Sequence, residues 1–167
     1  MASKFVHLHT HSHYSLLDGL SQIPDLVDRA KELGMEHLAL TDHGNLYGAV
    51  EFFQTATKAG ITPILGCELY ITPKSRHDRN REDARYHLPV LVKNETGWKN
   101  LLQLVTISNL EGFYYKPRID RELLEKHHEG LVCLSGCFSG EIPKLLHLGK
   151  REEAISAMEF YRGLFGD

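Results

Sequence analysis

Short apolar runs alternate with stretches of helical periodicity along this 167-residue chain. Runs rich in aliphatic and aromatic residues predict strands at residues 5–9, 37–41, 62–71, 87–92 and 131–135. Apolar positions three and four apart predict helices at residues 21–33, 46–59, 96–110 and 120–128, with one or two more toward the C-terminus. The polar residues 73–85 predict an exposed, mobile loop, and residues 111–120 an irregular segment.

Residues with strong start and stop preferences mark several of these helix ends. Ser21 is the predicted N-cap of the first helix, with Pro24 in its first turn and Gly34 after its end. Gly60 closes the second helix, and Asp120 caps the short helix near residue 128. These residues support the predicted helix ends independently of the apolar periodicity.

The alternation of strands and helices predicts an α/β fold built from βαβ units around a mainly parallel sheet. Apolar runs such as Leu131–Ser135 (LVCLS) suit strands buried on both faces. The predicted strands could form an open sheet or the first part of a (β/α) barrel that needs more chain to close. The abrupt end at Asp167, after a helix, suggests a fragment, and the expected organisation is one domain over residues 1–167.

Composition narrows the class of protein and shows where to look for chemistry. The net charge of −3 argues against a broad basic nucleic-acid-binding face. No apolar run reaches the length of a membrane span, and the three cysteines form no closed disulfide set, so a cytoplasmic location is expected. Histidine stands out, because four of the 11 histidines fall between His7 and His13.

The first candidate metal ligands lie at the end of the first predicted strand. His9 and His11 are two residues apart, so their side chains project from one face and can share an ion. Asp18 lies in the following loop, from which a third ligand could fold back. The alternative is a polar surface loop that happens to be rich in histidine.

Two more candidates lie on the next strands. His43 follows the C-terminal end of the second predicted strand, and Glu68 lies within the apolar third strand. Active sites of parallel α/β folds form at that end of the strands, which favours metal ligation. Glu68 could otherwise face solvent on an edge strand, or be a buried charge satisfied by other groups.

His87 and Cys137 are less clear from position alone. His87 opens the fourth predicted strand instead of closing it, which mismatches the other ligands unless that strand runs antiparallel. It could equally be structural. Cys137 follows the fifth strand and could supply a thiolate to zinc, although a small buried cysteine is the more common case.

This mixture of His, Asp, Glu and Cys suits zinc, manganese or iron better than calcium. Such ions lower the pKa of bound water and neutralise charge on a phosphoryl oxygen, which predicts hydrolysis of phosphate esters. The sequence has no phosphate-binding loop, nucleophile elbow or HExxH helix. The hydrolytic interpretation therefore depends on the metals.

Several longer strings resemble one family. FVHLHTHSHYSLLDG, TDHGNLYGAVEF, GITPILGCELYI, EGFYYKPRID and LSGC resemble the polymerase and histidinol phosphatase (PHP) domain, in the same order and with similar spacing from Phe5 to the end. The His-x-His motif is shared across the superfamily. YSLLDG and TDHGNLYGAVEF are more specific, and they resemble the PHP domain at the N-terminus of bacterial DNA polymerase III alpha subunits.

The resemblance implies a distorted (β/α)7 barrel that holds two or three divalent ions, with zinc favoured over manganese or iron. It places the ligands at His9, His11, Asp18, His43, Glu68, His87 and Cys137, with Glu68 bridging. The family's last ligands, an Asp-x-His pair, would lie beyond Asp167, as would the polymerase palm, fingers and thumb. The barrel is therefore expected to be truncated before its last strands, and the metal site to be incomplete.

The resemblance also implies a function in DNA replication. In some such polymerases the domain is a metal-dependent 3′–5′ exonuclease, whereas in others it is a non-catalytic scaffold; a free-standing phosphatase for a small monoester is a further alternative. Expected partners are a DNA primer 3′ end, the other polymerase domains, the sliding clamp and a proofreading subunit, with no membrane. Tyr114, Lys116 and Arg118 could hold single-stranded DNA, or their segment could pack on the fold instead.

Overall fold

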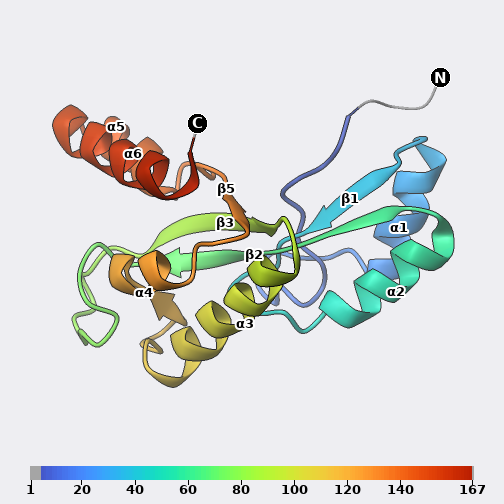
Figure 1. Ribbon diagram of the computed structural model, residues 1–167, viewed down its shortest axis with the longest axis horizontal. Coiled ribbons are helices and arrows are strands. Elements are labelled where there is room, and N and C mark those ends of the chain that lie inside the picture. Colours follow the sequence, from blue (N-terminus) through green and yellow to red (C-terminus); the bar gives the residue numbers. More distant parts are fainter. Residues whose placement is uncertain (1–4, 167) are drawn as a thin grey trace.

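A computed structural model describes residues 5–166 and shows a mixed α/β fold with a sheet of five strands (Figure 1). The strands are β1 (His37–Leu40), β2 (Thr62–Ile71), β3 (Tyr86–Val92), β4 (Arg118–Ile119) and β5 (Leu131–Cys133). Their order is β1-β2-β3-β5, and β4 pairs with β2. The long strand β2 is therefore the centre of the sheet.

The pairing directions differ from the predicted, mainly parallel sheet. β1 and β4 run parallel to β2, but β3 runs antiparallel to both β2 and β5. The connection between β2 and β3 is the loop at residues 73–85 and not a helix, so the chain can return directly along β2. This reversal brings the start of β3 to the same edge of the sheet as the end of β2.

The helices are α1 (Ile23–Glu32), α2 (Ala49–Ala59), α3 (Glu95–Leu110), α4 (Arg121–Lys126), α5 (Glu141–His147) and α6 (Arg151–Phe165). The predicted cap of α4 is confirmed, because the Asp120 carboxylate accepts a hydrogen bond from Leu123 N at 3.0 Å. The predicted cap of α1 is wrong. Gln22 occupies that position without a side-chain capping bond, and Ser21 uses its carbonyl to accept from His13 N.

The predicted strand at residues 5–9 is also wrong, although this segment runs beside β1. Ala39 N donates to His7 O at 2.9 Å and Thr41 N donates to Thr10 O at 2.8 Å. These bonds tie the segment to β1, but they are too few to make a regular ladder. The result keeps the side chains of His9 and His11 next to the end of β1.

Two hydrophobic clusters hold these elements together. One joins α1, β1 and α2 around Val27, Leu40 and Phe52; the other joins the second half of β2 with β3 and the later helices around Leu69 and Leu104. Figure 1 shows α1 and α2 beside β1 at one end, α3 and α4 below β2 and β3, and the α5–α6 hairpin above. Within residues 5–166, no helix is both long enough and apolar enough to cross a bilayer.

Candidate metal centre

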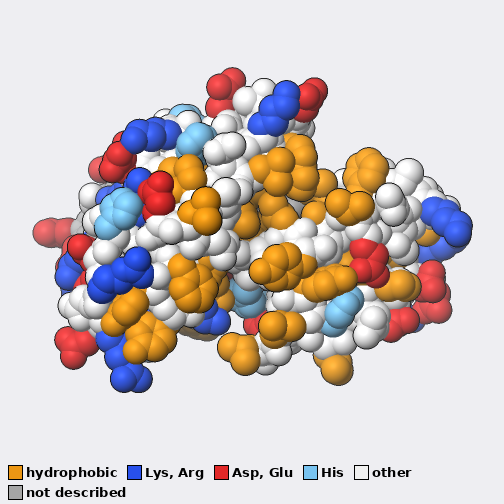
Figure 2. All heavy atoms as spheres, turned by 90° about the horizontal axis from the view of Figure 1, so that it is seen from below, with side chains coloured by type: hydrophobic (Ala, Val, Ile, Leu, Met, Phe, Trp, Pro, Cys, Tyr) orange, Lys and Arg blue, Asp and Glu red, His pale blue; other side chains and the backbone are white. Residues whose placement is uncertain are grey.

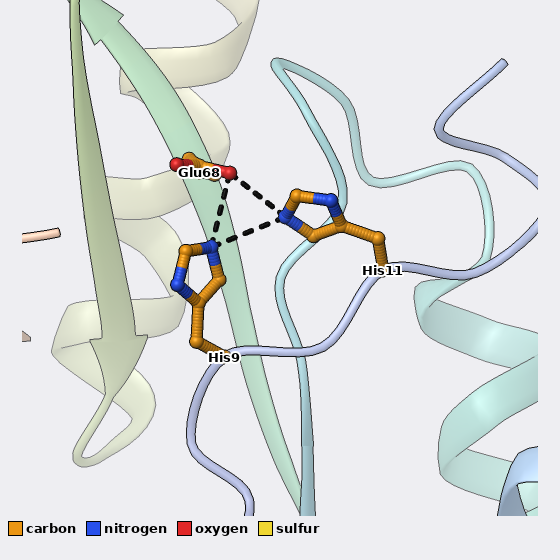
Figure 3. Close-up of side chains that lie close together, drawn as sticks. All are labelled: His9, His11 and Glu68. Carbon is orange, nitrogen blue, oxygen red and sulfur yellow. Dashed lines mark hydrogen bonds and ion pairs between the residues drawn. The ribbon is translucent and has the colours of Figure 1, made fainter. Parts of the chain in front are cut away.

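Glu68 lies at the centre of a cluster of histidines, near the end of β2. Its side chain is 1% exposed, and it lies on the same face of the strand as Tyr70. The Glu68 Oε2 atom lies 3.0 Å from His9 Nε2, 2.7 Å from His11 Nε2 and 3.2 Å from His43 Nδ1. Figure 3 shows the His9 and His11 rings, from the N-terminal segment, converging on this oxygen above the β2 ribbon.

The other carboxylate oxygen contacts a fourth histidine. Glu68 Oε1 lies 2.9 Å from His87 Nδ1. His87 is near the start of β3 and faces Tyr70 across the antiparallel pair, so its side chain is on the same face of the sheet as Glu68. The antiparallel direction of β3 therefore removes the geometric mismatch that its place in the sequence implied.

Asp18 extends the cluster from the loop that follows the histidines. Its Oδ2 atom lies 2.8 Å from His43 Nε2 and 3.5 Å from His11 Nδ1. Gly19 next to it must be glycine, since a Cβ there would lie 1.8 Å from Ser12 O. This close approach turns the loop back and places Asp18 against His43.

A buried carboxylate, Asp42, joins the loop that carries Asp18 to the end of β1. Asp42 is 2% exposed and accepts hydrogen bonds from Ser12 N at 2.7 Å, Ser12 Oγ at 2.8 Å and Ser15 Oγ at 2.8 Å. Ser15 Oγ also accepts from His43 N at 3.1 Å. The sequence prediction missed this network. Its one signal was an aspartate placed directly after a buried strand, in TDHG.

The electrostatics of the cluster follow from burial and these contacts. Burial opposes the charged form of Glu68, but hydrogen bonds from His11, His87 and His9 hold its pKa below the usual range. The bond to Glu68 raises the pKa of His11, against the effect of burial. Burial lowers the pKa of His43, despite its bond to Asp18. The cluster therefore holds a buried carboxylate that stays ionised beside two histidines whose pKa values move in opposite directions.

The donor set fits divalent metal ions. Three groups of residues could each hold an ion, because within each group the ligand atoms lie within 4.8 Å of one another. The groups are His9, His11 and Glu68; His11, Asp18 and His43; and His43, Glu68 and His87. His43 Nδ1 is buried and has no hydrogen-bond partner among the described residues, although it points at Glu68. A buried nitrogen without a hydrogen-bond partner lowers stability, and a metal ion bound to it would remove this cost.

The structure does not bring every predicted site residue into this cluster. Cys137 is exposed and belongs to none of the three groups, although its loop is close: His87 N donates to Ser139 O at 3.0 Å. Arg118 is 1% exposed and donates to the carbonyls of Gly112, Arg76 and Asp78, so its guanidinium is not free to hold DNA. Tyr114 and Lys116 are half-buried nearby.

Comparison with known proteins adds to the geometry. A family model described as PHP domain matches residues 7–167. DNA polymerase III subunit alpha of Borreliella burgdorferi is 50% identical over 99% of this chain, and that of Treponema pallidum is 54% identical over 97%. The chain covers 15% and 14% of these relatives, about one seventh of their length. A solved structure of a candidate metal-dependent phosphoesterase from Bifidobacterium adolescentis is similar with a TM-score of 0.46 and 21% sequence identity. The match covers 62% of this chain and 32% of that one.

Proposed function

The chain belongs to the PHP domain family, and we propose on that premise that its histidine cluster is a divalent-metal site that hydrolyses a phosphodiester at a DNA 3′ end. The observation that carries the proposal is the buried Glu68 carboxylate, which His9, His11, His43 and His87 contact and with which no lysine or arginine of residues 5–166 makes an ion pair. The relatives named above are replicative polymerase subunits, which supports DNA as the substrate.

We assign the ligands to His9, His11, Asp18, His43, Glu68 and His87, and Glu68, whose two oxygens face different histidines, would be the bridging ligand. Cys137 is one further ligand within the proposal, reached by a change in the loop that hydrogen-bonds to His87. Two or three ions are expected, with zinc ahead of manganese or iron because imidazole dominates the donor set.

The ions and the residues of the chain have different roles at the reacting phosphate. When bound, the ions supply Lewis-acid activation of water and neutralise charge on the phosphoryl oxygens. Glu68 and Asp18 balance the charge of the ions, and the histidines fix their positions. Asp42 holds the Asp18 loop against His43 through Ser12 and Ser15, so the two sides of the site keep one geometry.

The finer fold assignment belongs to the same proposal. We place the sheet within a (β/α)7 barrel of the PHP type. The extended segment near His7 runs along β1 as a first barrel strand would, and β1, β2, β3 and β5 are neighbours in that order in the sheet. The partners proposed with it are the other polymerase domains, the sliding clamp and a proofreading subunit.

Metal content and hydrolysis test the proposal together. Elemental analysis of the protein should find two or three ions, and His9→Ala should lose at least one. A 3′-labelled single-stranded primer should be shortened by the protein with zinc or manganese, and His9→Ala should reduce the rate at least about 100-fold. Bound metal without release of the 3′ nucleotide would leave a structural metal module and refute the exonuclease function.

A further inference from the structure

A cavity adjoins the metal cluster on the side of β3. It measures about 340 Å³ and is lined by Tyr70, Arg81, Arg85, His87, Tyr115 and Lys116. Tyr70 and His87 form the wall that it shares with the metal cluster, since the Tyr70 ring lies 5.7 Å from His43 and 5.1 Å from His87 between ring centroids. A molecule bound at the metal cluster could therefore extend into this cavity.

Three positive charges line this cavity, from Arg81, Arg85 and Lys116, and none of them makes an ion pair within residues 5–166. Two cations earlier in the same loop do: Lys74 Nζ lies 2.7 Å from Asp83, and Arg76 pairs with Asp120 and Glu111. A chain of net charge −3 thus gathers three unpaired cations at one cavity. Three positive charges around one cavity attract an anion to it.

Tyr115 holds two of these cations in place. The guanidinium groups of Arg81 and Arg85 lie 5.7 Å and 5.9 Å from the centroid of its ring. Tyr115 has a φ of 61°, the one positive φ outside glycine among the described residues, and its side chain is 59% exposed. A left-handed backbone is strained for a residue with a Cβ. Strain of this kind at an exposed aromatic residue is typical of binding sites.

The buried Arg118 explains how the cavity keeps its shape. Its guanidinium donates to Arg76 O and Asp78 O, both at 2.7 Å, and so fastens the 73–85 loop that carries Arg81 and Arg85. Burial and the positive charges of Arg79 and Arg85 lower the pKa of Arg118. Figure 2 shows basic, acidic and hydrophobic side chains mixed at its left end, where Figure 1 draws this loop.

We propose that Arg81, Arg85, Lys116 and Tyr115 form a subsite for the backbone of a single-stranded nucleic acid whose 3′-terminal phosphodiester lies at the metal cluster. The inference rests on the proposed function and narrows its substrate. Ions at the cluster would hold the scissile phosphate, so three further cations in an adjoining cavity serve a second phosphate. An exposed tyrosine offers a surface for stacking a base. A small monoester would use neither feature.

Oligonucleotide binding without metal tests the subsite separately from hydrolysis. Fluorescence anisotropy in EDTA would follow a 5′-labelled oligothymidylate of about ten nucleotides, within the usual range of single-strand sites. Arg81→Gln/Arg85→Gln should weaken binding about tenfold. It should also reduce the slope of log affinity against log salt by about 1.4, because each phosphate contact on a single strand releases about 0.7 counterion. The matched control is Lys31→Gln/Lys58→Gln, which removes two exposed charges on α1 and α2 and should leave affinity and slope unchanged.

The outcomes separate this inference from the proposed function. Equal losses in both double variants, or an unchanged salt slope in Arg81→Gln/Arg85→Gln, would overturn the subsite. Glu68→Gln should fail to cleave the oligonucleotide when metal is restored, whether or not the subsite is intact. Binding through the subsite without any cleavage by the wild type would refute hydrolysis alone. Cleavage that the arginine variants leave unchanged would refute the subsite alone.

Discussion

The chain buries two glutamates in different surroundings. Glu68, at the end of β2, is 1% exposed and is contacted by four histidines. Glu141, at the start of α5, is 5% exposed and accepts hydrogen bonds from Arg121 Nη2 at 2.9 Å and from the Tyr161 hydroxyl at 2.6 Å. Both carboxylates are removed from water at similar cost, but only one has a permanent cation beside it.

The partners decide what each buried charge can do. Arginine stays protonated at any physiological pH, and a buried tyrosine keeps its proton: burial and the Glu141 charge raise the pKa of Tyr161. The charge of Glu141 is therefore compensated by a permanent cation of the chain itself. Among the described residues no lysine or arginine makes an ion pair with Glu68, so its cluster holds no permanent cation. The comparison predicts that Glu68 needs an external ion and that Glu141 does not.

The largest expected effect comes from neutralising Glu68. Saturating zinc at about 100 times its Kd should stabilise the wild type by about 2.7 kcal/mol, which raises Tm by about 5–10 °C in a domain of this size. In Glu68→Gln this rise should vanish, because the bridging charge is gone. Differential scanning calorimetry with and without zinc measures the shift.

The same scan on Glu141→Gln gives the control for that comparison. Its carboxylate lies in the other network, so this variant should keep the full zinc-dependent rise in Tm. A zinc response that survives in Glu68→Gln would mean that the ion binds elsewhere on the protein. The ligand assignment at Glu68 would then be wrong.

Asp42→Asn is expected to have a smaller effect on the metal. Its amide NH₂ would face Ser12 N or a serine hydroxyl that now donates to a carboxylate oxygen, which loosens the loop carrying Asp18. Losses of this kind around metal ligands reduce affinity about 10–100-fold. Competition with a chromophoric chelator measures the zinc Kd.

Asp25→Asn, in the first turn of α1, is the matched control for Asp42→Asn. It makes the same chemical change at an exposed position, and the zinc Kd should stay within about twofold of the wild type. If Asp42→Asn also binds zinc with the wild-type Kd, the Ser12–Ser15 network does not position the site.

The local parts of the fold were predictable because their signals lie close together in the sequence. β2 matches its predicted range of residues 62–71, an apolar run that begins after Gly60. The 73–85 loop and the capped helix α4 follow from composition and from Asp120 in the same way. Each of these depends on neighbours within a few residues.

The parts that were missed depend on contacts far apart in the sequence. Whether β3 runs parallel or antiparallel is decided by its partners, and this direction places His87 against Glu68 across 19 residues. The Asp42 network joins residues 27 and 30 positions apart. The sequence left open whether Arg118 holds DNA or packs on the fold, because nothing local indicates that three carbonyls accept hydrogen bonds from it. Periodicity gives the elements, whereas the site arises from their pairing.

The smallest expected effect is on the free energy of unfolding, when the second buried carboxylate, Glu141, is neutralised. In Glu141→Gln the amide oxygen can still accept from Tyr161, but the charge-assisted bond to Arg121 becomes a neutral one. Because the Arg121 side chain is 34% exposed, water screens part of the loss, and the free energy of unfolding should fall by about 1–2 kcal/mol. Urea denaturation without metal measures this fall, beside Glu95→Gln in the exposed pair with Lys99, which should stay within about 0.5 kcal/mol of the wild type. A loss no larger than that of Glu95→Gln would mean that the Glu141 network adds no stability, and the contrast between a self-contained carboxylate and a metal-requiring one would fail.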